Sequence, residues 1–369
     1  SGMGFEYFYG FVGGDGNQWQ PNLFRNHTQI YPFKGDPEWN LVTGMADEAI
    51  NYLAEINQIQ PDKKFFVKYA PGATHAPHHP TKEWVEKIEA MNRFDDGYEK
   101  VRERIFENQK KLGVIPANTT MEPWPADLLA PWDDLDADTR KLFIKQAEVF
   151  AAYAAYSDHE IGRVIQAIDD MGKLDDTLII YIHGDNGTSA EGGPMGTPNE
   201  VAFFNGINKM PTDTQMKWYD VWGTEETYNH MPTGWAAAFS TPFKMFKRYS
   251  HSGGTCSPLV IHWPKGIKAR GEVRHQYSHS VDITPTILEA VGLEMPSVYR
   301  GVQQWPLSGK SMLYSFDAKP DGPTVRDRQY FAMLGTRGVW EKGWKAVAVH
   351  APLTDRGKFP EDEWELYHV

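Results

Sequence analysis

Apolar residues recur at helical spacing in two segments of the chain. In residues 46–58, Ala49, Leu53 and Ile56 lie on one helical face. In residues 144–171 a longer apolar stripe continues until Gly172, a residue type that commonly ends helices. We therefore expect one amphipathic helix in each segment. The stripe of the longer helix consists of Ala147, Ala151, Ala154, Ile161, Ile165 and Ile168.

Short, continuous apolar runs indicate buried strands at residues 64–70, 177–183 and 258–263. Each of the first two follows one of the expected helices. Thr284 and Pro285 supply an N-cap and a first-turn proline for a further helix that ends near Gly292. Alternation of helices with apolar strands predicts an α/β fold with a mixed, mostly parallel sheet between helices.

The pattern of expected helices and strands divides the chain into a large and a small part. Residues 1–320 are expected to form the α/β domain, with a charged, proline-interrupted helical insertion at about 81–139 that contains two helices. After residue 320, strand-like runs at 329–334, 338–341 and 344–349 are joined by turns that contain glycine. These runs predict a small antiparallel subdomain at 321–369.

Composition excludes some classes of protein. The chain has 37 Lys and Arg against 49 Asp and Glu, a formal net charge of −12, which argues against a generally basic nucleic-acid binder. No stretch approaches the roughly 18 apolar residues of a membrane span, and residues 1–11 lack a basic leader, so we expect no membrane anchor or signal peptide. The single cysteine, Cys256, excludes an intramolecular disulfide.

Polar residues that follow a buried strand are candidates for a binding site, because ligands of open α/β sheets bind beyond the carboxyl ends of strands. Asp185 and Asn186 follow the run at 177–183, on a turn flanked by glycines. A carboxylate beside a side-chain carbonyl suits a hard cation such as Ca²⁺ or Mg²⁺. The alternative is an ordinary turn, because Asp, Asn and Gly are common turn residues.

Histidines and a lysine supply further candidates. His75, His78 and His79 follow the run at 64–70, but Pro77 and the short gaps argue against convergence of all three imidazoles on a zinc ion. Lys247 lies in a basic stretch that would ordinarily be a solvated face. His230 and His251 occur in loops on either side of Lys247 and are candidates for lining a substrate entrance, with solvated loop positions as the alternative.

Taken in order, these segments resemble the type I sulfatases of the alkaline phosphatase superfamily, in particular bacterial arylsulfatases, over nearly the whole chain. The resemblance implies an alkaline-phosphatase-like fold. It also implies that Asp185 and Asn186 bind a divalent cation, Ca²⁺ in the first place and Mg²⁺ as the alternative, that His75 lies near the leaving group, and that Lys247 holds sulfate oxygens. The matching segments are GFEYFYGFVGG (4–14), APGATHAPHHP (70–80), HGDNGTSAEGG (183–193), Lys247 with the later Gly-Gly-Thr (253–255), PLVIHWPKGI (258–267), HSVDITPTILEAVG (279–292) and WELYHV (364–369).

These roles suit the chemistry of sulfate esters. Negative charge accumulates on the leaving oxygen and on the equatorial sulfate oxygens in the transition state, so cations and proton donors placed there lower the barrier. An imidazole donates protons near neutral pH, and a lysine ammonium stabilises charge directly. Among the residues of this chain, His75 and Lys247 would have these functions.

One part of the family pattern does not match. The family's formylglycine nucleophile arises from a Cys/Ser-x-Pro-x-Arg motif, which these 369 residues do not contain. Cys256, Ser257 and Pro258 imitate its first positions, but Val260 stands where the arginine belongs, so we interpret Cys256 as an ordinary thiol at a strand edge. We therefore predict that this chain alone is inactive and binds its cation weakly.

Three hypotheses remain open at this point. The first is an arylsulfatase that hydrolyses sulfate monoesters to an alcohol or phenol plus sulfate, present here as its central and C-terminal part. The second is a phosphate or phosphonate ester hydrolase of the same superfamily. The third is a non-catalytic relative that binds sulfated ligands or a partner. The expected partners are a small sulfated substrate and either a missing N-terminal segment or a second copy of the chain, and the resemblance alone suggests a periplasmic or extracellular location.

Overall fold

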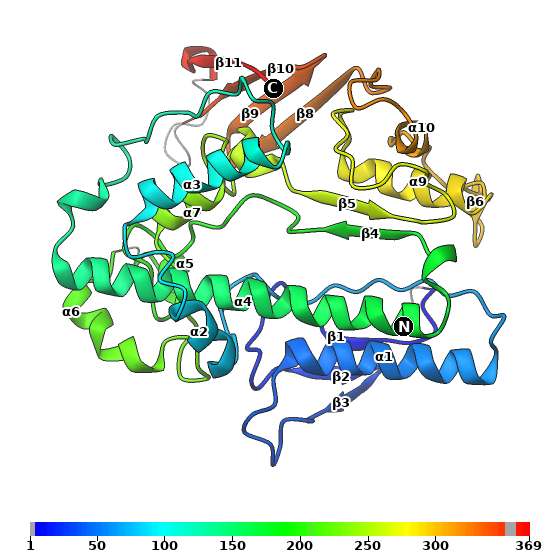
Figure 1. The fold of residues 1–369 in the computed structure, drawn as a ribbon, viewed down its shortest axis with the longest axis horizontal. Helices are drawn as coiled ribbons and strands as arrows, with labels where there is room; N and C mark the ends of the chain where they lie inside the picture. Colours follow the sequence, from blue (N-terminus) through cyan, green and yellow to red (C-terminus); the bar gives the residue numbers. More distant parts are fainter. Residues whose placement is uncertain (1–3, 208, 351–358) are drawn as a thin grey trace.

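The computed structural model describes residues 4–207, 209–350 and 359–369. Two long helices, α1 (Leu41–Ile59) and α4 (Ala137–Asp170), pack side by side, as Figure 1 shows. Asn40 and Asp136 cap their N-termini by accepting hydrogen bonds from the backbone N–H groups of Val42 and Thr139. Both predicted helices are therefore confirmed, and both begin earlier than the apolar stripes suggested.

Aliphatic side chains fill the interface between these two helices. Leu53 of α1 packs in one buried cluster with Val164 and Ile168 of α4. On the opposite side of α1 lies a small antiparallel sheet of β1 (Tyr9–Phe11), β2 (Leu23–Arg25) and β3 (Thr28–Ile30). Helix α1 therefore joins the N-terminal sheet to the main body of the molecule.

The segment around residues 81–139 contains the two expected helices, α2 (Lys82–Glu89) and α3 (Tyr98–Lys111). It packs into the largest hydrophobic cluster, in which Phe94 and Tyr98 meet residues of α4 and Trp235 of α7 (Thr233–Phe239). Phe94 and Tyr98 both meet Trp235 edge to face, an arrangement that aromatic rings favour because their edges are positive and their faces negative.

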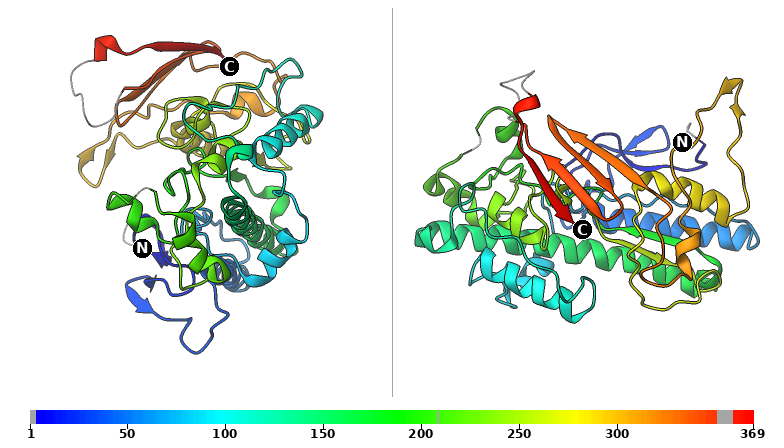
Figure 2. Two further views of the ribbon diagram at one scale, coloured as in Figure 1. Left: turned by 90° about the vertical axis from the view of Figure 1, so that its left-hand side faces the viewer. Right: turned by 90° about the horizontal axis from the view of Figure 1, so that it is seen from above.

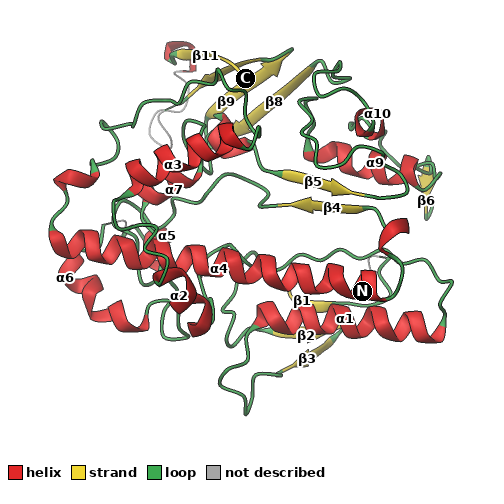
Figure 3. Cartoon of the chain, viewed as in Figure 1, coloured by secondary structure: helices red, strands yellow, loops and turns green. Residues whose placement is uncertain are grey.

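The central strands are β4 (Ile179–Ile182) and β5 (Leu259–His262), which confirms strands at two of the three apolar runs. The prediction that they are buried is wrong for the described chain, because no residue of either strand is fully buried and Val260 is 57% exposed. They pair antiparallel, with Ile180 opposite Ile261, whereas the sequence suggested a mostly parallel arrangement. Figure 3 shows the two strands above α4, with their arrows pointing in opposite directions. Among the described residues no two named strands pair in parallel.

The remaining apolar run, 64–70, is not a strand in this structure. It is extended, but no named strand pairs with it, and the side chain of Phe66 is 65% exposed. A β-strand needs a partner to hydrogen-bond its backbone, and apolar residues alone do not supply one. The prediction of a buried strand at 64–70 is therefore wrong for the described chain.

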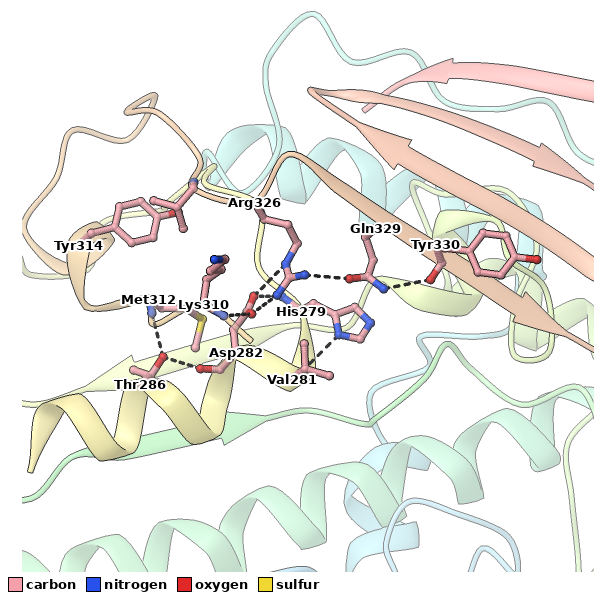
Figure 4. A network of polar contacts seen from close by, with 11 residues as sticks. His279, Val281, Asp282, Thr286, Lys310, Met312, Tyr314, Arg326, Gln329 and Tyr330 are labelled. Carbon is pink, nitrogen blue, oxygen red and sulfur yellow. Dashed lines mark hydrogen bonds and ion pairs between the residues drawn. The ribbon is translucent and has the colours of Figure 1, made fainter. Parts of the chain in front are cut away.

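A buried carboxylate organises the start of helix α9 (Ile283–Ala290), as Figure 4 shows. Asp282 ends the short helix η4 (Ser280–Asp282) and accepts a hydrogen bond from the backbone N–H of His279 at 2.8 Å. It also accepts from the backbone N–H of Lys310 at 2.7 Å and pairs with Arg326. The helix therefore begins at the His279–Asp282 cap, and Thr284, the expected N-cap, lies inside it.

The C-terminal residues form the predicted antiparallel sheet. Its strands are β8 (Arg328–Met333), β9 (Thr336–Glu341), β10 (Trp344–Ala348) and β11 (Trp364–His368), in the order β11-β10-β9-β8. Figure 2 shows this sheet at one end of the molecule, away from β1–β3. Arg326 connects it to α9 through Asp282.

Shorter elements join these parts. No helix of the described chain combines the length and hydropathy needed to cross a membrane. The shorter elements are η1 (Trp132–Asp134), η2 (Leu174–Asp176), α5 (Glu200–Phe204), α6 (Thr212–Gln215), η3 (Met216–Val221), α8 (Ser252–Thr255), β6 (Val298–Tyr299), β7 (Val302–Gln303), α10 (Leu313–Phe316) and η5 (Phe359–Glu361).

Candidate active site

Two loops at the ends of the central strands pack directly on each other. The backbone N–H of Gly187, in the loop after β4, donates to the carbonyl of Gly254 at 3.1 Å, and the N–H of Lys247 donates to the carbonyl of Thr188 at 3.0 Å. A Cβ on Gly187 would lie 1.6 Å from the carbonyl oxygen of Gly253. Only glycine permits this approach, which brings the Asp185–Asn186 turn and Lys247 into one structural unit.

Glu191 holds the Lys247 side chain in place. Its Oε2 lies 2.6 Å from Lys247 Nζ, and its Oε1 lies 2.8 Å from Nη2 of Arg248. Burial alone would raise the pKa of Glu191, but the hydrogen bond from Lys247 and the two cationic neighbours outweigh it, so the pKa is lowered. The carboxylate is 8% exposed, so this ion pair is shielded from solvent and fixes the ammonium group.

The structure brings His75 and Lys247 together although they are 172 residues apart in the sequence. His75 Nδ1 lies 2.8 Å from the carbonyl oxygen of Ala76, which assigns the ring proton to Nδ1 and leaves Nε2 as an acceptor. Lys247 Nζ lies 3.3 Å from this Nε2. The leaving-group histidine and the sulfate-binding lysine that the resemblance implies therefore face each other.

Glu200 is a buried carboxylate beside this pair. It is the first residue of α5 and is 1% exposed, and its backbone N–H donates to the carbonyl of Tyr228 at 2.7 Å. Neither of its carboxylate oxygens has a hydrogen-bond partner among the residues that the structure describes. Burial, above all, raises the pKa of Glu200 to about 7, and the charges of His75 and Lys247 oppose this shift.

Three of these side chains could share a metal ion. One ligand atom each from Asp15, His75 and Glu200 all lie within 4.8 Å of one another. Within residues 4–207, 209–350 and 359–369, this is the one group of three or more His, Cys, Asp or Glu residues with such spacing. It differs from the Asp185–Asn186 pair that the sequence suggested.

Asp185 and Asn186 form an exposed turn directly after β4. Asn186 Nδ2 donates to the carbonyl of Gly187 at 2.9 Å, which leaves its Oδ1 as a free acceptor. The Asp185 carboxylate has no hydrogen bond or ion pair with the residues that the structure describes. One oxygen from each of these two side chains can bind a hard cation, but Ca²⁺ takes six to eight oxygen ligands, so this pair supplies part of a coordination shell.

The two loop histidines do not line an entrance. His230 is fully buried, its Nδ1 donates to the carbonyl of Met231, and its Nε2 lies 2.9 Å from Ser189 Oγ. Burial lowers its pKa to about 4, so the ring is neutral. His251 is also buried, and its Nε2 lies 3.4 Å from the Glu365 carboxylate of β11. The prediction for both is corrected, because tertiary packing buries loops that looked solvated.

The other residues considered from the sequence, His78, His79 and Cys256, have structural roles. His79 is buried, with Nε2 donating to the carbonyl of Thr227 and Nδ1 accepting from the N–H of Gln18, so its ring is fully used by the backbone. His78 is buried against Phe150 and His230. Among the described residues, neither His78 nor His79 belongs to a group with the spacing of metal ligands. Cys256 lies just before β5, at the strand edge as expected, and is exposed.

Sequence reasoning missed Glu191, Glu200 and Asp15. Glu191 falls within the 183–193 segment, and Asp15 directly follows the 4–14 segment, so both could have been examined as neighbours of recognised motifs. Nothing in the local pattern around Glu200 shows that its carboxylate is buried, because that depends on contacts with residues far away in the chain.

Comparison with known proteins identifies related sequences. A family model described as Sulfatase matches residues 1–293. An uncharacterized sulfatase of Schizosaccharomyces pombe is 28% identical over 331 residues, which is 86% of this chain and 56% of that protein. An arylsulfatase of Klebsiella aerogenes is 24% identical over 223 residues, 59% of this chain and 45% of that protein. The chain thus spans about half the length of these curated relatives.

Solved structures show the same fold. The crystal structure of Ps i-CgsB in complex with k-i-k-neocarrahexaose matches with a TM-score of 0.55 and 17% identity, covering 99% of this chain and 60% of that one. Similarity at this level of identity shows the fold alone. It confirms the alkaline-phosphatase-like class inferred from the sequence, with a C-terminal antiparallel sheet.

Proposed function

Because the chain belongs to the sulfatase family, we propose that it carries part of an arylsulfatase-type active site, which hydrolyses sulfate monoesters to an alcohol or phenol plus sulfate. The observation that carries this proposal is the 3.3 Å approach of Lys247 Nζ to His75 Nε2. A cation and an imidazole at this distance can contact neighbouring oxygens of one sulfate ester.

Lys247 is the group that binds the sulfate oxygens. Glu191 fixes its ammonium group before substrate arrives, so little ordering is required when the anion binds. The ammonium has three donors, and a sulfate oxygen can replace the contact with His75 while the Glu191 ion pair remains. Charge that develops on sulfate in the transition state is then stabilised at a fixed position.

His75 is the proton donor to the leaving oxygen. Its Nδ1 is held by the carbonyl of Ala76, so Nε2 is the ring atom that points toward Lys247 and the bound sulfate. Nε2 is an acceptor in this structure, so it must first take up a proton from solvent when substrate displaces the contact with Lys247. This proton passes to the departing oxygen when the S–O bond to the alcohol or phenol breaks, and the ring returns to the neutral form with its proton on Nδ1. A neutral alcohol or phenol leaves more easily than its anion.

Asp185 and Asn186 would hold the divalent cation, which we propose is Ca²⁺, with Mg²⁺ as the alternative. Bound there, the cation would neutralise charge on the sulfate group. The two oxygens of this turn leave most of a Ca²⁺ shell to water or to other ligands, so we expect weak binding by the 369-residue chain. The family's formylglycine motif does not occur in these residues, so we assign no step to it and expect no turnover from this chain alone.

The test compares two substrates with the intact gene product. We expect 4-nitrophenyl sulfate to be hydrolysed with a higher kcat/KM than 4-nitrophenyl phosphate. Lys247→Met should lower kcat/KM on the sulfate by roughly 100-fold or more, as loss of a charge-stabilising group in other enzymes does. Lys217→Met, an exposed lysine of η3, is the matched control and should leave the rate unchanged.

Other outcomes would replace the proposal. A preference for the phosphate ester would favour a phosphate or phosphonate hydrolase. Sulfate binding without hydrolysis of either ester by the intact protein would favour a non-catalytic relative that binds sulfated ligands. Robust turnover of aryl sulfate by the pure 369-residue chain would contradict the expectation that this chain alone is inactive.

A further inference from the structure

Glu200 lies in an environment that does not satisfy a free carboxylate. Both of its oxygens are buried, and neither accepts a hydrogen bond from the described part of the chain. Burying a charged group without partners is costly, so such groups are normally neutralised, paired or bound to a metal. The nearby cation, Lys247, is already paired with Glu191 at 2.6 Å. Glu200 therefore has unused capacity to bind a ligand.

Two further ligand groups face Glu200. Asp15 and His75 each place one ligand atom within 4.8 Å of the other and of a Glu200 oxygen. Asp15 lies in the loop Gly13-Gly14-Asp15-Gly16, where added Cβ atoms would meet no heavy atom closer than 3.5 Å. The Asp15 carboxylate accepts a hydrogen bond from the Tyr228 hydroxyl group, so a metal ion would share this carboxylate with Tyr228 or displace that contact.

The tautomer of His75 is the one that metal-binding histidines use. Its Nδ1–H donates to the carbonyl of Ala76, which fixes the ring and leaves the Nε2 lone pair free to bind an ion. Among the residues that the structure describes, Lys247 Nζ is the one hydrogen-bond partner of that lone pair, at 3.3 Å. A metal ion would compete with this ammonium for the same lone pair.

We propose that Asp15, His75 and Glu200 form a binding site for a divalent transition-metal ion such as Zn²⁺ or Co²⁺, separate from the hard-cation site at Asp185 and Asn186. One imidazole and two carboxylates match the ligand preference of these ions, whereas Ca²⁺ prefers oxygen ligands only. The site goes beyond the proposed function, because it requires neither substrate nor turnover. An ion bound there would occupy His75 Nε2 and block its proton transfer.

The test is calorimetric titration of the metal-free chain with Zn²⁺ alone. We expect one saturable site in the wild type, and at least tenfold weaker binding in Glu200→Gln and in His75→Asn. Glu226→Gln and His262→Asn are matched controls at exposed positions and should bind Zn²⁺ as the wild type does. Glu200→Gln replaces an unpaired buried carboxylate with a neutral group of the same shape, so it is expected to fold, which thermal unfolding verifies.

Two further measurements sharpen the assignment. Lys247→Met removes the competing ammonium and should tighten Zn²⁺ binding, so weaker binding in this variant would contradict the assignment of His75 Nε2. Replacing Zn²⁺ with Co²⁺ gives a visible absorption spectrum that should change in His75→Asn and not in His262→Asn. Absence of a saturable Zn²⁺ site, or wild-type affinity in both Glu200→Gln and His75→Asn, would overturn the proposal.

The outcome is independent of the proposed function. Asp185→Asn should leave Zn²⁺ binding unchanged, because Asp185 is not part of this group. If Zn²⁺ binds as expected while the intact protein fails to hydrolyse sulfate esters, only the proposed function is wrong. If sulfate esters are hydrolysed but Zn²⁺ does not bind, only the transition-metal site is wrong.

Discussion

Two buried carboxylates in this molecule have opposite surroundings. Asp282, at the start of α9, is 2% exposed and accepts hydrogen bonds from the backbone N–H groups of His279 and Lys310 and from the Arg326 guanidinium. Glu200, at the start of α5, is 1% exposed, and its carboxylate accepts no hydrogen bond within residues 4–207, 209–350 and 359–369. Both are placed by short helices, so the difference comes from the neighbours that the fold supplies.

The difference separates structural groups from groups available for function. A buried charge with all its hydrogen bonds made stabilises one arrangement of the chain, as Asp282 does between α9, the Lys310 loop and the segment that leads into β8. A buried charge without partners destabilises the fold unless something binds or neutralises it. The following predictions test this distinction on three buried carboxylates.

The largest effect is expected for Asp282→Ala. It leaves Arg326, 11% exposed, without its carboxylate and two backbone N–H groups without their acceptor, so the free energy of unfolding should fall by about 3–5 kcal/mol. Urea denaturation measures this change. The control is Asp327→Ala, which removes an exposed carboxylate next to Arg326 in the sequence and should change the free energy of unfolding little. Equal effects of the two substitutions would contradict the structural assignment of Asp282.

An intermediate effect is expected for Glu148 of α4, which is 7% exposed. Burial and the adjacent Glu89 carboxylate raise the pKa of Glu148 to about 7, whereas nearby Lys145 opposes the shift. The folded state therefore binds more protons than the unfolded state between about pH 4.5 and 7. The stability that this proton uptake contributes is fully present below pH 4.5 and is lost as the pH rises through 7. The free energy of unfolding therefore falls by an amount on the order of 2 kcal/mol over this range.

Glu148→Gln should remove this pH dependence. Urea denaturation of wild type and variant at pH 5 and pH 8 isolates it, because the other titrating groups are common to both proteins. We expect the variant to gain stability relative to the wild type at pH 8 and to differ less at pH 5. The same difference at both pH values would show that the environment of Glu148 does not favour its neutral form.

The smallest effect is expected for Glu200→Gln in metal-free buffer at pH 8. Removing an unpaired buried charge should raise the free energy of unfolding by about 1 kcal/mol, the opposite sign to Asp282→Ala. Glu191→Gln provides the contrast, because it breaks the ion pairs with Lys247 and Arg248 and should lower stability. Thermal unfolding measures both. A loss of stability in Glu200→Gln would mean that Glu200 has partners like those of Asp282.

Local sequence patterns predicted the parts of the fold that depend on local interactions. The helices α1 and α4 and the strands β8 to β10 follow from apolar spacing and glycine turns, because those elements satisfy their backbone groups within a short segment. Residues 64–70 have the same apolar character but no pairing strand, and the prediction failed there. The antiparallel pairing of β4 with β5 likewise depends on a connection of many residues.

The candidate site shows the same division. The sequence by itself indicated the family and the alternation of helices and strands. It also indicated His75, Lys247, Asp185 and Asn186 as candidate site residues, because each of them lies in or beside a short motif of the chain. Only the tertiary structure decided that His75 meets Lys247, that His230 and His251 are buried, and that Glu200 lies without a partner. Burial and pairing depend on atoms from distant segments, and no local pattern of residues specifies which of those segments will meet.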